Sequence, residues 1–373
     1  MSPLLVGLLG IAATLLLIAV QFPIGLALML VSFVGVSSFV GFASAASLTA
    51  AVTGDIATNW TLSAIPMFLF MGVVVHRSGM TASLYQAARL WLGFLPGGLA
   101  VATNLACAGF GAACGSSLAT TVAIGRFAIP EMLHSRYDRG LATGVCACAG
   151  TIGILIPPSI PMVIYGIFAG VPVTDLFIAG IIPGLLTAAA YTAMIVARCA
   201  ADPRLAPPTH ESADRDAKWR ALADVWPFPL LALLVIGGLY AGWVTPTEAG
   251  ALGAGASLVV ALGLRTLSWR ILWQAARETT TTTAAILFVA IGAGLLTKLM
   301  AFSGVPQAIS AFVAESALHP LALIVCVSLV YIVLGMFLDP LGLILLTLPI
   351  FLPLFQAQGL DLLWFGILLV KFV

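Results

Sequence analysis

Long apolar segments, separated by short polar ones, run through almost the whole chain. A helix of about 20 apolar residues is long enough to cross the hydrocarbon core of a bilayer. The pattern predicts such helices at 4–20, 23–42, 61–76, 140–171, 175–197, 226–243, 246–264, 282–299 and from 362 onward. We therefore predict an all-α polytopic membrane protein.

Two apolar stretches, 95–132 and 320–356, are too long for one crossing and are interrupted by glycine and polar residues. We predict that both are re-entrant helical hairpins, which dip into the membrane and return. With this topology, all of the 15 Lys and Arg residues except Lys298 and Lys371 fall on one side. The positive-inside rule makes that side cytoplasmic and places the N-terminus in the periplasm.

Composition supports the membrane assignment. The chain is 61% hydrophobic and 8% charged, with a mean hydropathy of +1.15, whereas soluble domains have about 25% charged residues. No Lys or Arg precedes the first apolar segment, so we expect it to be retained as a span. The six cysteines lack zinc or disulfide spacing, no phosphate-binding loop for ATP is present, and a net charge of +1 indicates nothing about partners.

Short motifs recur at a nearly constant separation of 223 to 225 residues. An odd number of predicted crossings separates the copies, which inverts the second copy relative to the first. Inverted repeats with discontinuous helices are typical of secondary transporters. The matching pairs are Pro23 and Pro246, Ser78-Gly79 and Ser303-Gly304, Pro130 and Pro353, and Asp138 and Asp361.

The repeat defines the predicted domain organisation. It comprises a first helix at 1–22, repeat 1 at 23–199, a cytoplasmic loop at 200–224, a connecting helix at 225–245 and repeat 2 at 246–373. Repeat 1 contains the hairpin 95–132 and a broken helix at 140–171, and repeat 2 contains the hairpin 320–356. The partner of Pro157 and Pro158 would lie beyond Val373. We therefore expect a fragment that lacks about two membrane segments, either as a piece of sequence or as a natural truncation.

The segment from Gly150 to Ser159 interrupts an apolar run with two prolines, two glycines and two hydroxyls. Proline lacks the amide hydrogen, so the break frees carbonyl groups that lipid cannot satisfy. A kink packed against neighbouring helices is the simpler alternative. The doubled proline beside Gly and Ser favours a transport site.

The first hairpin tip is expected to meet this broken helix. Amide groups at half-helix ends favour a carboxylate, while carbonyl and hydroxyl oxygens favour a sodium ion. The expected site residues are Gly115, Ser116, Ser117, Thr120, Thr151, Gly153, Pro157, Pro158 and Ser159, with Gly335, Asp339 and Pro340 in the second copy.

Two polar residues near the hairpin tips each have two alternative roles. Asp339 is either a coordinating or protonatable group or a helix cap. Asn104 either adds a carbonyl oxygen to the site or forms a structural hydrogen bond. The residues alone leave both alternatives open.

These residues resemble the large membrane subunit of tripartite ATP-independent periplasmic (TRAP) transporters, of the dicarboxylate and sialic acid type. The resemblance is carried by Gly115-Ser116-Ser117, Ala119-Thr120, Ile124-Gly125, Ile129-Pro130, Gly150 to Ser159, Pro183-Gly184, Asp339-Pro340 and Pro349 to Pro353. It implies an elevator-type transporter in a bacterial inner membrane, in which sodium ions drive uptake of a small organic anion. It also implies two partners, a small four-helix membrane subunit and a periplasmic substrate-binding protein.

The resemblance further implies that Ser116, Ser117, Thr151 and Gly153 hold sodium, mainly through backbone oxygens. The segment from Gly335 to Pro340 would begin a second sodium site. Two departures stand out: Cys114 replaces a usual serine, and the Thr-Pro-Pro motif of the second copy is absent. The second site is therefore expected to be incomplete, and the chain alone is not expected to transport.

Other functions fit less well. An intramembrane serine hydrolase would need a histidine within reach of Ser116 or Ser117, but His134 lies many residues from the tip. A channel would line a pore instead of converging on two tips. The nearer alternative is a stand-alone sodium-coupled carboxylate carrier. We expect no enzyme activity and no nucleic-acid partner; the particular acid, the number of sodium ions and the oligomeric state are left open.

Overall fold

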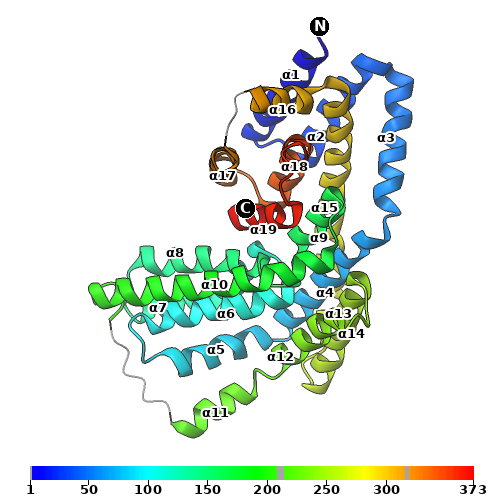
Figure 1. Cartoon of the computed structure of the whole chain (residues 1–373). Coiled ribbons are helices and arrows are strands. Elements are labelled where there is room, and N and C mark those ends of the chain that lie inside the picture. Colours follow the sequence, from blue (N-terminus) through cyan, green and yellow to red (C-terminus); the bar gives the residue numbers. More distant parts are fainter. Residues whose placement is uncertain (1, 208–213, 316–318) are drawn as a thin grey trace. The chain divides into compact units, whose positions relative to one another are not determined.

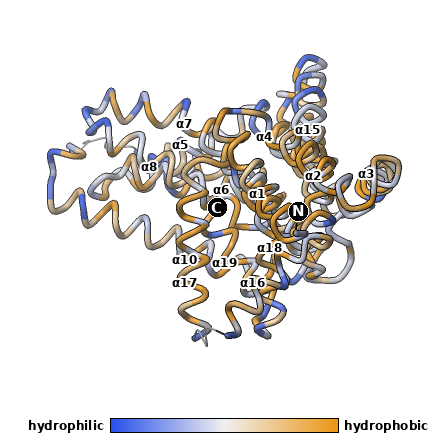
Figure 2. The backbone as a smooth tube through the Cα atoms, turned by 90° about the horizontal axis from the view of Figure 1, so that it is seen from above, coloured by the Kyte–Doolittle hydropathy of each residue, from blue (hydrophilic) through white to orange (hydrophobic). Residues whose placement is uncertain are grey.

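The computed structural model describes residues 2–207, 214–315 and 319–373, and every regular element in them is helical (Figure 1). The all-α prediction is therefore confirmed. Within these described ranges, five helical segments are able, by length and composition, to cross a membrane: Trp60–Arg77, Val173–Ala201, Arg215–Tyr240, Trp269–Ser303 and Pro340–Ala357. Figure 2 shows hydrophobic colours along much of the helical backbone and hydrophilic colours mainly near helix ends and loops.

The chain divides into two compact units. The first contains Met1–Leu62, Ile164–Val171 and Thr281–Val373, and the second contains Ser63–Val163 and Pro172–Thr280. The helices of the first unit are α1 (Pro3–Ala19), α2 (Ile24–Val40), α3 (Phe42–Ala57), α16 (Val305–Glu315), α17 (Pro320–Gly335), α18 (Pro340–Ala357) and α19 (Leu362–Phe372).

The second unit holds the first hairpin and the broken helix. Its helices are α4 (Ala64–Arg77), α5 (Met80–Leu92), α6 (Gly98–Cys114), α7 (Ser117–His134), α8 (Arg139–Gly150), α10 (Val173–Ala201), α11 (Arg215–Ala223), α12 (Pro227–Ala232), α13 (Gly238–Tyr240) and α14 (Pro246–Gly263). Two further helices, α9 (Ile160–Ala169) and α15 (Trp269–Ser303), contain two of the four points where the chain passes between the units.

Helix α6 forms the centre of the second unit. Its sequence is rich in Gly and Ala, and nearly all of its residues are buried. The small side chains allow close packing against α5, α7, α8 and α10, which lie beside it (Figure 1). At its far end, the Tyr137 hydroxyl accepts a hydrogen bond of 3.3 Å from the Leu99 amide. This bond ties the base of α6 to the turn that follows α7.

The first unit is held by aromatic and hydroxyl contacts. Phe355 of α18 stacks on Phe365 of α19 with ring centroids 3.9 Å apart. Tyr165 of α9 donates a hydrogen bond of 2.6 Å to the Leu362 carbonyl. The hairpin helices α17 and α18 are joined by a 2.6 Å hydrogen bond between the Tyr331 and Thr347 hydroxyls. The second hairpin therefore has a buried polar link that the first lacks at the matching positions, which hold Ala108 and Ile124.

Local structure repeats at the spacing seen in the sequence. Helices α7 and α18 begin and end 223 residues apart, and α8 and α19 begin 223 residues apart. The turn after α7 has Arg136 at a φ of 62°, and the turn after α18 has Gly359 at 64°. The bond from Tyr137 N to Met132 O has its counterpart in the bond from Leu360 N to Phe355 O. The two copies therefore share backbone hydrogen bonds even where their side chains differ.

The structure also refines the predicted segments. The hairpin 95–132 corresponds to α6 and α7, the hairpin 320–356 to α17 and α18, and the broken helix 140–171 to α8, a 3₁₀ turn and α9. The segment 225–245 is α12, a π-helical turn at Leu233–Gly237 and α13. Residues 208–213 of the predicted loop and 316–318 of repeat 2 lie outside the described residues. Re-entrance, sidedness and the domain boundaries stay predictions.

Tyr331→Phe should lower the free energy of unfolding by about 1 kcal/mol, because it removes one buried hydrogen bond without creating a cavity. Thr347 keeps its own bond to the Leu343 carbonyl, so no hydroxyl is left unsatisfied. The measurement is the melting temperature of the purified protein in detergent. Tyr240→Phe is the control, since Tyr240 is 47% exposed; equal melting temperatures for both variants would contradict the prediction.

Candidate functional site

The tip of the first hairpin is closed by its own backbone. Gly115 ends α6 with a φ of +62°, and its amide donates to the Gly111 carbonyl at 2.8 Å. This left-handed conformation favours glycine, because a Cβ would be strained there. Ser116 begins the second arm, and its hydroxyl accepts a bond from the Ala119 amide at 3.4 Å. The hairpin therefore reverses direction within two residues.

Side chains at the tip form a small polar cluster. The Thr120 hydroxyl donates to the Ser116 carbonyl at 2.8 Å, and it also lies 3.1 Å from the Cys114 Sγ. Cys114 is buried, with 3% of its surface exposed. Its thiol thus occupies a hydrogen-bonding position, so the tip is polar although residue 114 has no hydroxyl.

The broken helix has the irregular form that its prolines predict. Helix α8 ends at Gly150, a 3₁₀ turn covers Thr151–Ile154, and α9 begins at Ile160. The Pro157–Pro158 peptide bond is cis. Ser159 caps α9, its hydroxyl accepting from the Met162 amide at 3.4 Å. The segment between the two helices therefore exposes carbonyl groups to its neighbours in the fold.

The hairpin tip contacts this break through backbone atoms. The Ile160 amide donates to the Gly115 carbonyl at 3.2 Å. A Cβ on Gly115 would lie 2.5 Å from the Pro158 carbonyl oxygen, and one on Gly111 would overlap the Gly153 Cα. Only glycine at both 111 and 153 permits such an approach.

The structure thus brings most of the predicted residues of the first copy together. Gly115, Pro158 and the Ser159–Ile160 link lie in contact. A Cβ built on Gly153 would lie 3.0 Å from the Thr120 hydroxyl. Ser116, Ser117 and Thr151 are half-buried beside this contact, and Pro157 belongs to the break. Whether they bind an ion stays a prediction.

Four helix ends converge here: the C-termini of α6 and α8 and the N-termini of α7 and α9. Carbonyl ends carry partial negative charge and amide ends partial positive charge. The described residues contain no group of three or more His, Cys, Asp or Glu side chains suited to a metal ion. Any cation bound at this contact would therefore depend mainly on carbonyl and hydroxyl oxygens.

The matching tip of the second hairpin is capped by a carboxylate. Asp339 precedes α18, and its Oδ2 accepts from the Gly342 amide at 3.1 Å. Asp339 therefore acts as a helix cap, one of the two roles considered for it from the sequence. In the repeat, Asp339 occupies the position equivalent to Ser116. Gly335 ends α17 and Pro340 begins α18. An additional ion-binding role for these residues stays a prediction.

Asn104 forms structural hydrogen bonds, the second of the two roles considered for it from the sequence. Its Nδ2 donates to the Ala188 carbonyl and to the Thr192 hydroxyl, both at 2.9 Å. It lies three helical turns before the tip, in the middle of α6. We therefore place Asn104 outside the tip contact.

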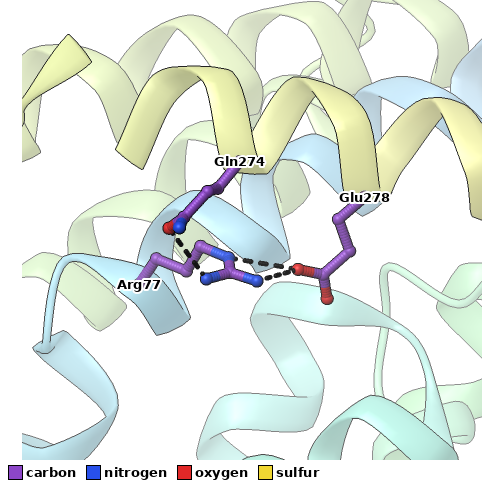
Figure 3. Close-up of polar contacts among 3 residues, drawn as sticks. All are labelled: Arg77, Gln274 and Glu278. Atoms are coloured by element: carbon purple, nitrogen blue, oxygen red, sulfur yellow. Dashed lines mark hydrogen bonds and ion pairs between the residues drawn. The ribbon is translucent and has the colours of Figure 1, made fainter. Parts of the chain in front are cut away.

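A cavity of about 130 Å³ lies beside the tip and was missed by the sequence analysis. Its lining includes His76 and Arg77 of α4, Cys114, Arg126 of α7 and Glu278 of α15. Arg77 forms an ion pair of 2.6 Å with Glu278 and a hydrogen bond of 3.0 Å with Gln274 (Figure 3). Arg77 and Arg126 in apolar helices were the available signal, but the acidic partner of Arg77 lies 201 residues away.

A hairpin tip packed against a broken helix inside an apolar helical protein is typical of secondary transporters. The chain matches the family "Tripartite ATP-independent periplasmic transporter, DctM component" over residues 11–373, and it belongs to this family. The family resemblance seen in the sequence is therefore confirmed.

Relatives with different named substrates are similar over most of the chain. The C4-dicarboxylate TRAP transporter large permease protein DctM of Pseudomonas aeruginosa is 36% identical over 84% of this chain and 73% of its own length. The ectoine/5-hydroxyectoine protein UehC of Ruegeria pomeroyi is 34% identical over 81% of this chain and 70% of its own. The sialic acid protein SiaM of Vibrio cholerae is 31% identical over 84% and 73%. All are named as permeases, so the expectation of a transporter subunit and not an enzyme is confirmed.

A solved structure supports the fold. The YdaH transporter of Alcanivorax borkumensis, described as having an unusual topology, matches with a TM-score of 0.55 at 16% identity. The match covers 89% of this chain and 76% of that one. At this identity the similarity concerns the fold alone.

Gly111→Ala should destabilise the protein by about 1–3 kcal/mol, because the new methyl group forces the hairpin away from the break. Gly144→Ala is a matched control, since Gly144 is also helical and a Cβ there meets nothing within 4 Å. It should be neutral or stabilise by up to about 1 kcal/mol. Melting temperatures in detergent give the comparison; a Gly111→Ala protein as stable as Gly144→Ala would contradict the packing argument.

Proposed function

We propose that the chain is the large membrane subunit of a sodium-coupled secondary transporter. It imports a small organic acid delivered by a periplasmic binding protein. The observation that carries the proposal is the contact between the hairpin tip at Gly115 and the break at Pro158 to Ile160. Helix ends meeting inside an apolar protein are suited to bind ions and charged substrates.

Sodium is the cation that the tip chemistry fits best. It is a hard ion that prefers oxygen ligands, and the tip offers backbone carbonyls together with hydroxyls. We assign Ser116, Ser117, Thr151 and Gly153 to this site. The second site would begin at Gly335, Asp339 and Pro340.

The proposed partners are a small four-helix membrane subunit and a periplasmic substrate-binding protein. Membership of a tripartite family supports both. The relatives are named for C4-dicarboxylates, sialic acid and ectoines, which supports small organic anions or zwitterions as substrates. A stand-alone carrier receives less support, since these relatives carry the name of a TRAP system.

We place the subunit in a bacterial inner membrane with its arginine-rich side in the cytoplasm and its N-terminus in the periplasm. Transport would follow an elevator mechanism, in which the hairpins and broken helix carry the substrate across. The two inverted repeats and two re-entrant hairpins of the sequence analysis belong to this proposal.

The test is uptake of labelled organic acids into proteoliposomes that contain the complete transporter, with and without each partner. We expect uptake that requires a sodium gradient, the small subunit and the binding protein. Uptake by the large subunit alone would overturn the tripartite proposal. Uptake that is independent of sodium would overturn the coupling.

Thr151→Val should raise the sodium concentration for half-maximal uptake by about fivefold, as expected from the loss of one oxygen ligand worth roughly 1 kcal/mol. Thr143→Val is the matched control. Both hydroxyls donate to the carbonyl of a preceding residue at 2.8 Å, but Thr143 lies two turns earlier on α8. An equal sodium dependence in the two variants would contradict a role for the Thr151 hydroxyl as a sodium ligand.

A further inference from the structure

We propose that the cavity bordered by Arg126 binds a carboxylate group of the transported anion. This inference rests on the proposed function and assigns to one residue the recognition of substrate charge. We call the space the Arg126 cavity, lined by Gly72, His76, Arg77, Cys114, Arg126 and Glu278 among others.

The charges around the Arg126 cavity leave an excess of one positive charge. Glu278 neutralises Arg77, with Nη2 at 2.6 Å and Nε at 3.1 Å from the same carboxylate oxygen (Figure 3). Arg126 makes no hydrogen bond or ion pair with any residue that the structure describes. Its guanidinium is therefore available to an anion.

A neighbouring acidic residue is already paired. Arg126 also borders a second cavity together with Arg89 and Glu131, but the Glu131 carboxylate lies 2.9 Å from Arg89. The Arg77–Glu278 and Arg89–Glu131 ion pairs thus lie on either side of Arg126, whose guanidinium has no carboxylate partner among the described residues. Arginine presents parallel N–H donors that match the two oxygens of a carboxylate.

A second donor faces the same space. His76 lines the cavity, and its Nδ1 is buried without a hydrogen-bond partner among the described residues. A buried ring nitrogen left without a partner costs free energy. In the tautomer with hydrogen on Nδ1, it would donate to an anion held by Arg126.

The cavity is small and adjoins the tip. A volume of about 130 Å³ corresponds to roughly four water molecules, which suits a carboxylate and the first atoms of its carbon chain. Cys114 lines the cavity and contacts Thr120 and Ser116 at the tip. An anion here would therefore lie next to the proposed sodium site, and opposite charges in adjacent sites favour binding of both.

The second copy of the repeat has no equivalent group. The residue 223 positions after Arg126 is Pro349, and the residue 225 positions after His76, the spacing of the adjacent Ser78-Gly79 pair, is Ala301. The cationic cavity is thus specific to the first hairpin, although the helices that carry it are repeated. The fold alone does not require these charges.

The experiment compares Arg126→Gln, Arg126→Lys and Arg139→Gln in the complete transporter, reconstituted with both partners. Uptake of an organic acid taken up by the unaltered protein is measured against substrate and against sodium. Arg126→Gln should raise the KM for the acid about 10- to 100-fold, and Arg126→Lys should raise it about 3- to 10-fold. Arg139→Gln removes an exposed positive charge outside the Arg126 cavity and should leave the KM within about twofold.

Each outcome decides the proposal. An unchanged KM in Arg126→Gln, or an equal rise in Arg139→Gln, would overturn it while leaving the proposed function intact. If Arg126→Gln is not recovered as folded protein, Arg126→Lys decides by the same criterion. Absence of organic-acid uptake by the unaltered protein would overturn the proposed function and this inference together.

Discussion

The contact between two backbones at the hairpin tip constrains the rest of the second unit. Gly111 lies against Gly153, and Gly115 accepts a hydrogen bond from Ile160. For the main chains to approach so closely, α6 must carry small residues along its length and α8 must end before the prolines. The close packing of α5, α7, α8 and α10 on α6 follows from the same requirement, because small side chains pack only when their neighbours are near.

Interrupting helices inside an apolar protein leaves helix ends that need partners, and the chain satisfies them locally. Ser116, Asp138, Asp339 and Asp361 each cap the helix that follows. Their side chains accept bonds from amides two or three residues ahead, so water is not needed at these positions. In the part of the chain that the structure describes, no such side-chain partner is found for the carbonyls between Ile154 and Ser159, the segment that adjoins the proposed ion site.

Sequence reasoning located the hairpins and the break to within about three residues, since Gly, Pro and polar residues inside apolar runs mark helix ends directly. It missed features that depend on tertiary contacts. The Arg77–Glu278 pair joins residues 201 positions apart, and no local pattern indicates it. The predicted span 282–299 is only part of α15, whose 35 residues continue through the polar segment Glu278 to Thr283. Polarity ended the predicted span there, but it does not end a helix.

The two copies of the repeat have preserved a backbone while exchanging its side chains. Arg136 and Gly359 adopt the same left-handed turn, although arginine pays a conformational cost there that glycine does not. Ser116 and Asp339 cap equivalent helices with a hydroxyl in one case and a carboxylate in the other. Within one molecule, these pairs show which backbone features both halves need and which side chains differ between them. The two halves therefore share a backbone, while their side chains make them chemically unequal.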